Sequence, residues 1–351
     1  MKSFLASVTF CTAATLATGC GKSADSYSLL SDASSYKQNS TYIPRKVDVL
    51  WVIDNSGSMQ TSQQNLTDHF QAFIQRFQQT DSDFHMAVTT SDAYLAPYDP
   101  SYATYSRIRD GVTNSDMNVH SGVFVMTKAT PNLNTVFLKN ITQGIRGSGD
   151  ERVHSSMEAT LSDPWNNSFR RPGAFLAVIM VTDEDDFSHN GLNMSENYND
   201  SSMIPAQHYL DFLTNLTAFG GSSKNFSVNA ITIVDSACRA QLTTGSQKIS
   251  TRVAELVNGS GGQLVSLCSD FSTSLQSLSN SIIELSSSFQ LTRVPLESTL
   301  VISVGGSVIP RGSSNGWTYD AGSNSIVFHG TSIPAAGADI TVNFDPATIR
   351  N

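Results

Sequence analysis

The sequence predicts an α/β fold, with a doubly wound, mostly parallel sheet of six strands and helices on both faces, followed by a small all-β module. Strand and helix patterns alternate between residues 41 and 290. The strand patterns are continuous apolar runs, which is typical of strands buried on both faces of a sheet. After residue 290 the helical periodicity stops, and short alternating strands with glycine turns follow. The length of 351 residues agrees with about two domains.

The N-terminal segment, residues 1–19, has the pattern of an export signal. A lysine follows Met1, a mildly apolar stretch comes next, and small residues precede Cys20. This ending resembles a bacterial lipobox, in which Cys20 is lipidated and anchors the mature protein in a membrane. Glycine after the cysteine favours the outer membrane by the same resemblance. An ordinary cleaved signal is the alternative. Residues 20–40 are polar and rich in serine, so we expect a flexible tether.

Six segments between 41 and 290 carry the strand pattern. They are 47–54, 84–90, 122–127, 174–183, 226–234 and 263–267. The third follows the second with no clear helix between them, so we expect these two to form a hairpin at an antiparallel edge.

Helical patterns separate the other strands. They cover 63–78, 132–142, 151–161, 205–219, 247–257 and 271–289. The last is the clearest, because its apolar residues recur at steps of four and three and form one stripe. The final segment, 291–351, alternates apolar residues around Gly305-Gly306 and predicts a β module of about 60 residues, which is too small to be stable unless it packs on the larger domain.

The residues that follow the first strand carry the strongest chemical signal. Asp54, Ser56 and Ser58 stand at alternate positions on the turn that leaves this strand. One carboxylate and two hydroxyls are hard oxygen donors, which suit a hard divalent cation such as Mg²⁺. The predicted strand 174–183 also ends in an aspartate, Asp183.

The D-x-S-x-S pattern at Asp54 resembles the metal-ion-dependent adhesion site (MIDAS) of von Willebrand factor A (vWA) domains. The resemblance implies a vWA fold and implies that Asp183 completes the site, often through water. The family's third motif is a threonine, which is absent from the loop 144–151. Ser148, Asp150 or Glu151 must substitute, and we favour Glu151. A third carboxylate would make the ion less electrophilic, or favour Mn²⁺ or Ca²⁺ over Mg²⁺.

Loops on the same edge of the sheet offer a surface for a partner. The segment 91–121 carries Tyr94, Tyr98, Tyr102 and Tyr105, which either contact a partner or pack the loop onto its scaffold. The acidic run 184–186 is interpreted as a solvated loop in preference to a second cation site. The long segment 187–204 is interpreted as part of a binding rim.

Two cysteines remain after the signal and the lipid site, Cys238 and Cys268. In an exported protein this pair predicts a disulfide, with two free thiols as the alternative. Composition excludes other classes of function. A net charge of −9 argues against nucleic acid as a partner. The sequence has no zinc-protease motif, and its Gly-x-Ser-x-Gly match at residues 312–316 lies in the predicted all-β module and not between a strand and a helix, so we do not expect an enzyme.

These observations predict a surface-anchored, cation-dependent adhesin that captures an Asp or Glu carboxylate of a protein on another cell or surface. An envelope scaffold that uses the same site on a neighbouring protein is the alternative.

Overall fold

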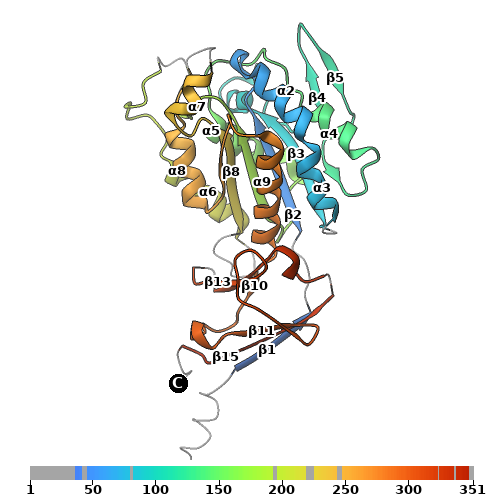
Figure 1. Cartoon of the computed structure of the whole chain (residues 1–351). Coiled ribbons are helices and arrows are strands. Elements are labelled where there is room, and N and C mark those ends of the chain that lie inside the picture. The colour runs from blue at the N-terminus through green and yellow to red at the C-terminus, as the bar shows by residue number, and fades with distance from the viewer. Residues whose placement is uncertain are drawn as a thin grey trace, which may run out of the picture.

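The computed structural model describes residues 36–41, 46–79, 82–192, 196–218, 225–242, 247–322, 324–335 and 337–347. The predicted signal, Cys20 and residues 20–35 of the predicted tether lie outside this range. An α/β part and a smaller all-β part lie one above the other along the long axis of the molecule (Figure 1). No helix of the described residues is long and apolar enough to cross a membrane.

The α/β part is built on a six-stranded sheet with the order β6-β3-β2-β7-β8-β9. Its strands are β2 (Val47–Ile53), β3 (Phe84–Thr90), β6 (Met126–Thr127), β7 (Phe175–Val181), β8 (Phe226–Thr232) and β9 (Leu264–Ser266). Neighbouring strands are parallel except at the edge, where β6 runs antiparallel to β3. The six predicted strands and the antiparallel hairpin are therefore confirmed. A second hairpin, β4 (Gly111–Thr113) with β5 (Asn118–His120), was not predicted because each strand has only three residues.

Helices cover both faces of this sheet, as predicted for a doubly wound fold (Figure 1). They are α2 (Gln60–His69), α3 (Gln71–Gln79), α4 (Leu133–Ile141), α5 (Val153–Ser162), α6 (Ala206–Thr217), α7 (Ser236–Gln241), α8 (Thr251–Ser260) and α9 (Phe271–Ser286). One apolar core lies between the sheet and α2, α3, α4 and α9. A second lies between the sheet and α5, α6 and α8.

Two helix predictions differ from the structure. The segment 63–78 is two helices, α2 and α3, which meet at the buried Phe70. Phe70 packs against Trp51, the large buried side chain of β2, and this contact sets where the chain turns. The helix predicted at 247–257 starts later, at Thr251, because Gln247 and Ser250 hydrogen-bond to the loop after β7.

The all-β part contains two small sheets around its own apolar core. Their strands are β1 (Tyr36–Thr41), β10 (Phe289–Gln290), β11 (Val301–Val304), β12 (Ser307–Ile309), β13 (Gly316–Asp320), β14 (Ser325–His329) and β15 (Asp339–Phe344). The prediction of a flexible tether is wrong for residues 36–40. Those residues form β1, which pairs with β15 and packs the Tyr36 ring against that of Phe344 in a tilted arrangement, with ring centroids 5.2 Å apart.

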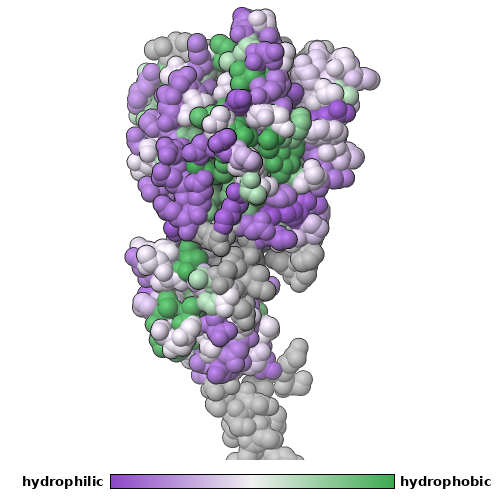
Figure 2. All heavy atoms as spheres, turned by 90° about the vertical axis from the view of Figure 1, so that its right-hand side faces the viewer, coloured by the Kyte–Doolittle hydropathy of each residue, from purple (hydrophilic) through white to green (hydrophobic). Residues whose placement is uncertain are grey.

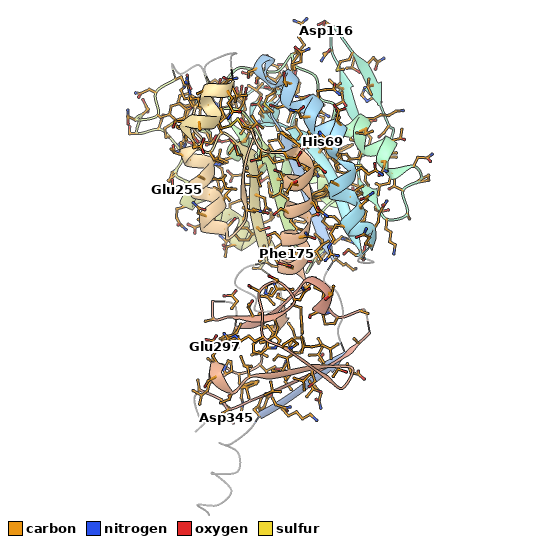
Figure 3. All side chains as sticks on the ribbon, in the orientation of Figure 1. His69, Asp116, Phe175, Glu255, Glu297 and Asp345 are labelled. Atoms are coloured by element: carbon orange, nitrogen blue, oxygen red, sulfur yellow. A yellow bond between two sulfur atoms is a disulfide. The ribbon has the colours of Figure 1, made fainter. Side chains whose placement is uncertain are left out.

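The surface is mixed in character. On the face shown in Figure 2, apolar side chains gather in the middle of the α/β part, and polar side chains cover its outer edges. Figure 3 shows that side chains from the helices and strands fill the space between the layers of both parts. The upper edge of the α/β part in these views holds the loops that leave the carboxyl ends of β2 and β7 (Figure 1).

The predicted disulfide is confirmed between Cys238 of α7 and Cys268, which follows β9. Their Cα atoms are 5.4 Å apart, within the range that a disulfide can bridge. It joins the crossover between β8 and β9 to the segment between β9 and α9, with the two cysteines 30 residues apart in sequence.

Replacing both cysteines with serine should lower the free energy of unfolding by about 3 to 4 kcal/mol, because the open loop regains conformational entropy in the unfolded state. Urea titration followed by circular dichroism would measure the change. A reducing agent should reproduce the loss in the native protein and have no effect on the double variant; equal sensitivity of both would contradict the prediction.

Candidate metal site at the carboxyl ends of β2 and β7

The two aspartates of the predicted metal site leave neighbouring strands at the same level. β2 and β7 are parallel, with Ile53 opposite Val181 in the register. The Asp54 amide extends this pairing by donating to the Val181 carbonyl at 2.9 Å. Asp183 comes two residues after Val181, so both carboxylates reach the same edge of the sheet. Both side chains are almost fully buried.

A chain of hydrogen bonds joins the predicted oxygen ligands. The Ser56 amide donates to Asp54 Oδ1 at 2.8 Å, which closes the turn after β2. Ser56 Oγ lies 3.1 Å from Ser58 Oγ, and Ser58 Oγ donates to Asp183 Oδ1 at 3.0 Å. The structure therefore brings the four residues together around one point.

Three side chains that the sequence analysis missed hold this arrangement in place. Thr182 Oγ1 donates to Asp54 Oδ2 at 2.9 Å. Gln247 Nε2 donates to Asp183 Oδ2 at 3.3 Å, and Gln63 Nε2 donates at 2.8 Å to the carbonyls of both Asp54 and Gly144. Thr182 could have been recognised by its place before Asp183, whereas nothing local marks the two glutamines.

Glu151 is the residue of the loop 144–151 that reaches the site. Glu151 is 3% exposed, and its carboxyl group lies close enough to that of Asp54 for the two to interact. Its second oxygen, Oε2, is buried with no hydrogen-bond partner among the described residues. A buried carboxylate oxygen without a partner costs free energy, and a bound ligand would supply the missing partner.

The two alternatives to Glu151 are engaged elsewhere. Asp150 binds the Arg152 guanidinium through Nε, at 3.0 Å to each carboxylate oxygen, and accepts from the Tyr94 hydroxyl at 3.3 Å. Ser148 Oγ accepts from the Asp150 amide at 3.1 Å. Both contacts shape the loop and leave Glu151 beside Asp54.

Three neighbouring carboxyl groups disturb one another at this site. Burial, followed by repulsion from Asp54, raises the pKa of Asp183 to about 6. Burial raises the pKa of Asp54, and burial together with the charge of Asp54 raises the pKa of Glu151 well above its usual value. Each shift has the direction expected for acidic groups that lack a compensating cation.

These residues fit a hard divalent cation. The donors are carboxylate and hydroxyl oxygens, which such ions prefer, and the charge of an ion would relieve the mutual repulsion. Within the described part of the chain, no group of three or more His, Cys, Asp or Glu side chains could by itself hold a metal ion. A cation at this place would therefore need the serine hydroxyls as well as the carboxylates.

The expectation that residues 184–186 form a solvated acidic loop is wrong. Glu184, Asp185 and Asp186 are all buried. Asp185 accepts from the amides of Arg252 and Val253 at 2.9 and 3.2 Å, so it caps the N-terminus of α8.

Asp186 is compensated in a different way. It accepts from the His154 amide at the start of α5 at 3.0 Å, and its Oδ2 lies 3.3 Å from Arg252 Nη2 and 3.0 Å from His154 Nδ1. Burial alone would raise the pKa of Asp186, but these charged and donor groups outweigh it and lower the pKa.

The four tyrosines of the segment 91–121 have different roles. Tyr94 is buried under the Arg152 guanidinium, 4.3 Å from its ring centroid, and packs the loop onto its scaffold. Tyr102 and Tyr105 are half-buried and pack on each other edge to face. Tyr98 is 42% exposed, and its hydroxyl joins the segment to the 187–204 loop through the His189 carbonyl and the Gly191 amide. Of the four, Tyr98 is the most exposed.

The sheet is the predicted doubly wound sheet of six strands, parallel except at one antiparallel edge. No family model and no curated protein sequence matches this chain.

Solved structures with a similar arrangement include proximal thread matrix protein 1 from the mussel byssus with a zinc-occupied MIDAS motif. It is 14% identical, with 73% of this chain and 52% of that chain covered and a TM-score of 0.39. The pilus adhesin SpaC from Lactobacillus rhamnosus GG is 12% identical, with 88% and 40% covered and a TM-score of 0.43. Human COPII-coat protein Sec24c is 11% identical, with 91% and 42% covered and a TM-score of 0.38. The chain spans about half of these proteins or less, and similarity at this level assigns neither a family nor a partner.

Replacing Asp186 with asparagine should cost about 3 kcal/mol at pH 7, because it removes one charge of a buried, paired group. The pKa of Asp186 is lower in the folded protein than its value of about 3.9 in the unfolded chain, so its charge stabilises the folded state above that pH. This stabilisation is lost as the pH falls toward the pKa of the folded state. The difference between variant and native protein should therefore shrink below about pH 4. Urea titrations from pH 3 to pH 8 would measure it, with the exposed Asp211→Asn as control. A difference that does not change with pH would contradict this account.

Proposed function

We propose that this chain is an exported, lipid-anchored binding protein that captures a carboxylate of a partner protein at a divalent cation. Asp54, Ser56 and Ser58 would hold the ion, with Glu151 and Asp183 completing the ligand set. The ion would be Mg²⁺, or Mn²⁺ or Ca²⁺. It would supply a positive, electrophilic point for the partner's Asp or Glu side chain. We place the protein at the outer surface of the outer membrane, where the contact would join cells or surfaces.

The convergence of carboxylates and hydroxyls at the ends of β2 and β7 carries this proposal. Asp54, Glu151 and Asp183 bring negative charge to one buried point, and the hydrogen bonds described to them come from neutral groups. A structural ion pair would instead have placed an arginine or lysine there, as Arg171 does at the buried Asp48. A site built in this way gains stability from an added cation.

The surroundings of the site suit a protein partner. Glu151 and Glu184 line a small acidic cavity of about 130 Å³ together with Glu196. A partner's carboxylate would be repelled there, so its capture depends on the cation. Tyr98 and the loop around Gly191 form a rim that the cation-bound partner would contact. This rim would supply specificity through shape and hydrogen bonds.

Divalent cations should raise the melting temperature of the lipid-free protein. A ligand at 100 times its dissociation constant stabilises the native state by about 2.7 kcal/mol. Melting curves with Mg²⁺, Mn²⁺, Ca²⁺ or EDTA would measure the shift. The fragment must begin before Tyr36, because β1 belongs to the fold. Asp54→Ala should abolish the shift; if no cation shifts the native protein, the proposed function fails.

Two matched variants would test the third acidic ligand. Glu151→Gln should raise the melting temperature in EDTA, because it removes a carboxylate that neighbouring carboxylates repel. It should also weaken the apparent affinity for Mg²⁺, obtained from the dependence of the melting temperature on Mg²⁺ concentration, about tenfold or more. Asp150→Asn removes a neighbouring carboxylate that faces Arg152 and should leave the affinity for Mg²⁺ unchanged. The reverse pattern would assign the position to Asp150.

The location of the partner separates an adhesin from an envelope scaffold. Antibodies against the α/β part should label intact cells if the protein is an adhesin, because the binding loops would face the medium. Immunofluorescence with and without permeabilisation would measure this, with a known periplasmic protein as control. Labelling that requires permeabilisation would favour the scaffold.

A further inference from the structure

A second cleft lies beside the metal site, toward the β3 edge of the sheet. Its volume is about 400 Å³, within the range of small-ligand sites. Asn55, the residue after Asp54, forms part of its wall and donates to Asp92 Oδ2 at 3.0 Å. Most of the remaining wall comes from the segment 104–114, together with Phe124 and Trp165. The cleft and the metal site therefore share one wall and have different linings.

Two arginines give this cleft a positive character. Arg107 and Arg109 both line it. Among the residues that the structure describes, no carboxylate pairs with either guanidinium, and both Nε atoms are buried without a hydrogen-bond partner. Arg109 Nη2 donates only to the Tyr105 carbonyl, at 3.3 Å. Unpaired guanidinium groups in a cleft are suited to a bidentate contact with a carboxylate.

The acidic groups of the cleft are already engaged by other donors. Asp92 accepts from the Ser148 amide at 3.0 Å as well as from Asn55. Asp110 accepts from His120 Nδ1 at 2.8 Å and from the Gly122 amide at 3.2 Å. Both carboxylates therefore hold loops in place and leave the two arginines without a counter-charge in contact.

Aromatic rings stand at the opening. Phe124 and Trp165 are 39% and 44% exposed, and their ring centroids lie 5.1 Å apart. The Arg107 guanidinium lies 5.5 Å from the Trp165 ring and the Arg109 guanidinium lies 5.3 Å from the Tyr105 ring, so the rings hold the cations in position.

The rest of the lining offers neutral hydrogen-bonding groups. Thr90 Oγ1, at the end of β3, is buried with no partner in the described structure. Other neutral polar residues of the lining are Asn55, Thr104, Thr113, Asn114 and Gln143. Hydroxyl and amide side chains of this kind can both donate to and accept from the hydroxyls of a ligand.

We propose that this cleft binds an acidic saccharide, with the carboxylate of a uronic acid on Arg107 and Arg109, a sugar face against the exposed rings, and sugar hydroxyls on the threonine and amide side chains. An acidic peptide would satisfy the arginines but would leave the neutral lining without a comparable set of hydroxyls. The site is independent of the cation at Asp54. A surface protein with both sites would bind a protein carboxylate and a charged glycan on one face.

Calorimetric titration of the full-length chain in detergent, with EDTA present, would test this inference. The probes are D-galacturonate and D-glucuronate, with glucose and acetate as the neutral and the simple-anion comparison. We expect a uronate to bind more tightly than either comparison. Arg107→Gln should weaken its binding roughly tenfold or more, since a hydrogen bond to a charged group is lost. Trp165→Ala, an exposed position, should weaken it as well.

Arg311→Gln is the matched control, because Arg311 also lies 5.5 Å from a tryptophan ring, that of Trp317 in the all-β part. This variant should bind the uronate as the native protein does. A melting curve for each variant shows that the fold is intact. Equal binding of acetate and uronate, or unchanged binding in both cleft variants, would overturn the proposal. Uronate binding that is absent in EDTA and appears only when Mg²⁺ replaces EDTA would assign the sugar to the metal site and would also overturn the proposal. Because the main titration is done in EDTA, failure of the cation experiment leaves it unaffected.

Discussion

The accumulation of buried negative charge at the carboxyl ends of β2 and β7 is the constraint on which the upper edge of the molecule depends. Parallel pairing brings Asp54 and Asp183 to one level, and the loop before α5 adds Glu151. In a medium of low polarity such groups repel one another and resist ionisation. The surrounding chain places neutral hydrogen-bond donors against these groups, including Thr182 and Gln247. The donors hold the carboxylate oxygens in position but do not neutralise their charge. The side chains of the site are thus held in place by hydrogen bonds, while none of the described hydrogen bonds to their carboxylates comes from a cationic group.

Two acidic residues that follow the site along the chain, Asp185 and Asp186, are buried carboxylates whose negative charge is compensated. Asp185 caps α8, and Asp186 meets Arg252, His154 and the start of α5. These contacts make the two carboxylates part of the scaffold, because helix N-termini and cations stabilise buried anions. Asp54 is as buried as Asp185 and Asp186 but has only neutral partners among its described hydrogen bonds. This difference distinguishes the carboxylates that hold the loops from the carboxylates that we propose as ion ligands.

The cleft lined by Arg107 and Arg109 differs, because among the described residues no carboxylate is in direct contact with either guanidinium, although Asp92 and Asp110 also line the cleft. It shares the wall at Asn55 with the metal site. The two proposed ligand positions, of opposite charge preference, therefore lie on one edge, both at the ends of strands of the central sheet. Loops carry the ligand contacts and the sheet supplies the fixed reference, which is the usual division of roles in open α/β sheets.

The sequence by itself determined the six strands, the antiparallel edge, the disulfide and the motif at Asp54, because each depends on local pattern or on short spacing. It left open which of Ser148, Asp150 and Glu151 reaches the site and whether Tyr94 contacts a partner or its own scaffold, and it misjudged the acidic run. Those outcomes depend on contacts between segments that are far apart in the chain, such as Arg152 with Asp150 or residues 36–41 with β15. Only the tertiary structure decided them, because burial and charge compensation are properties of the assembled loops and not of any one of them.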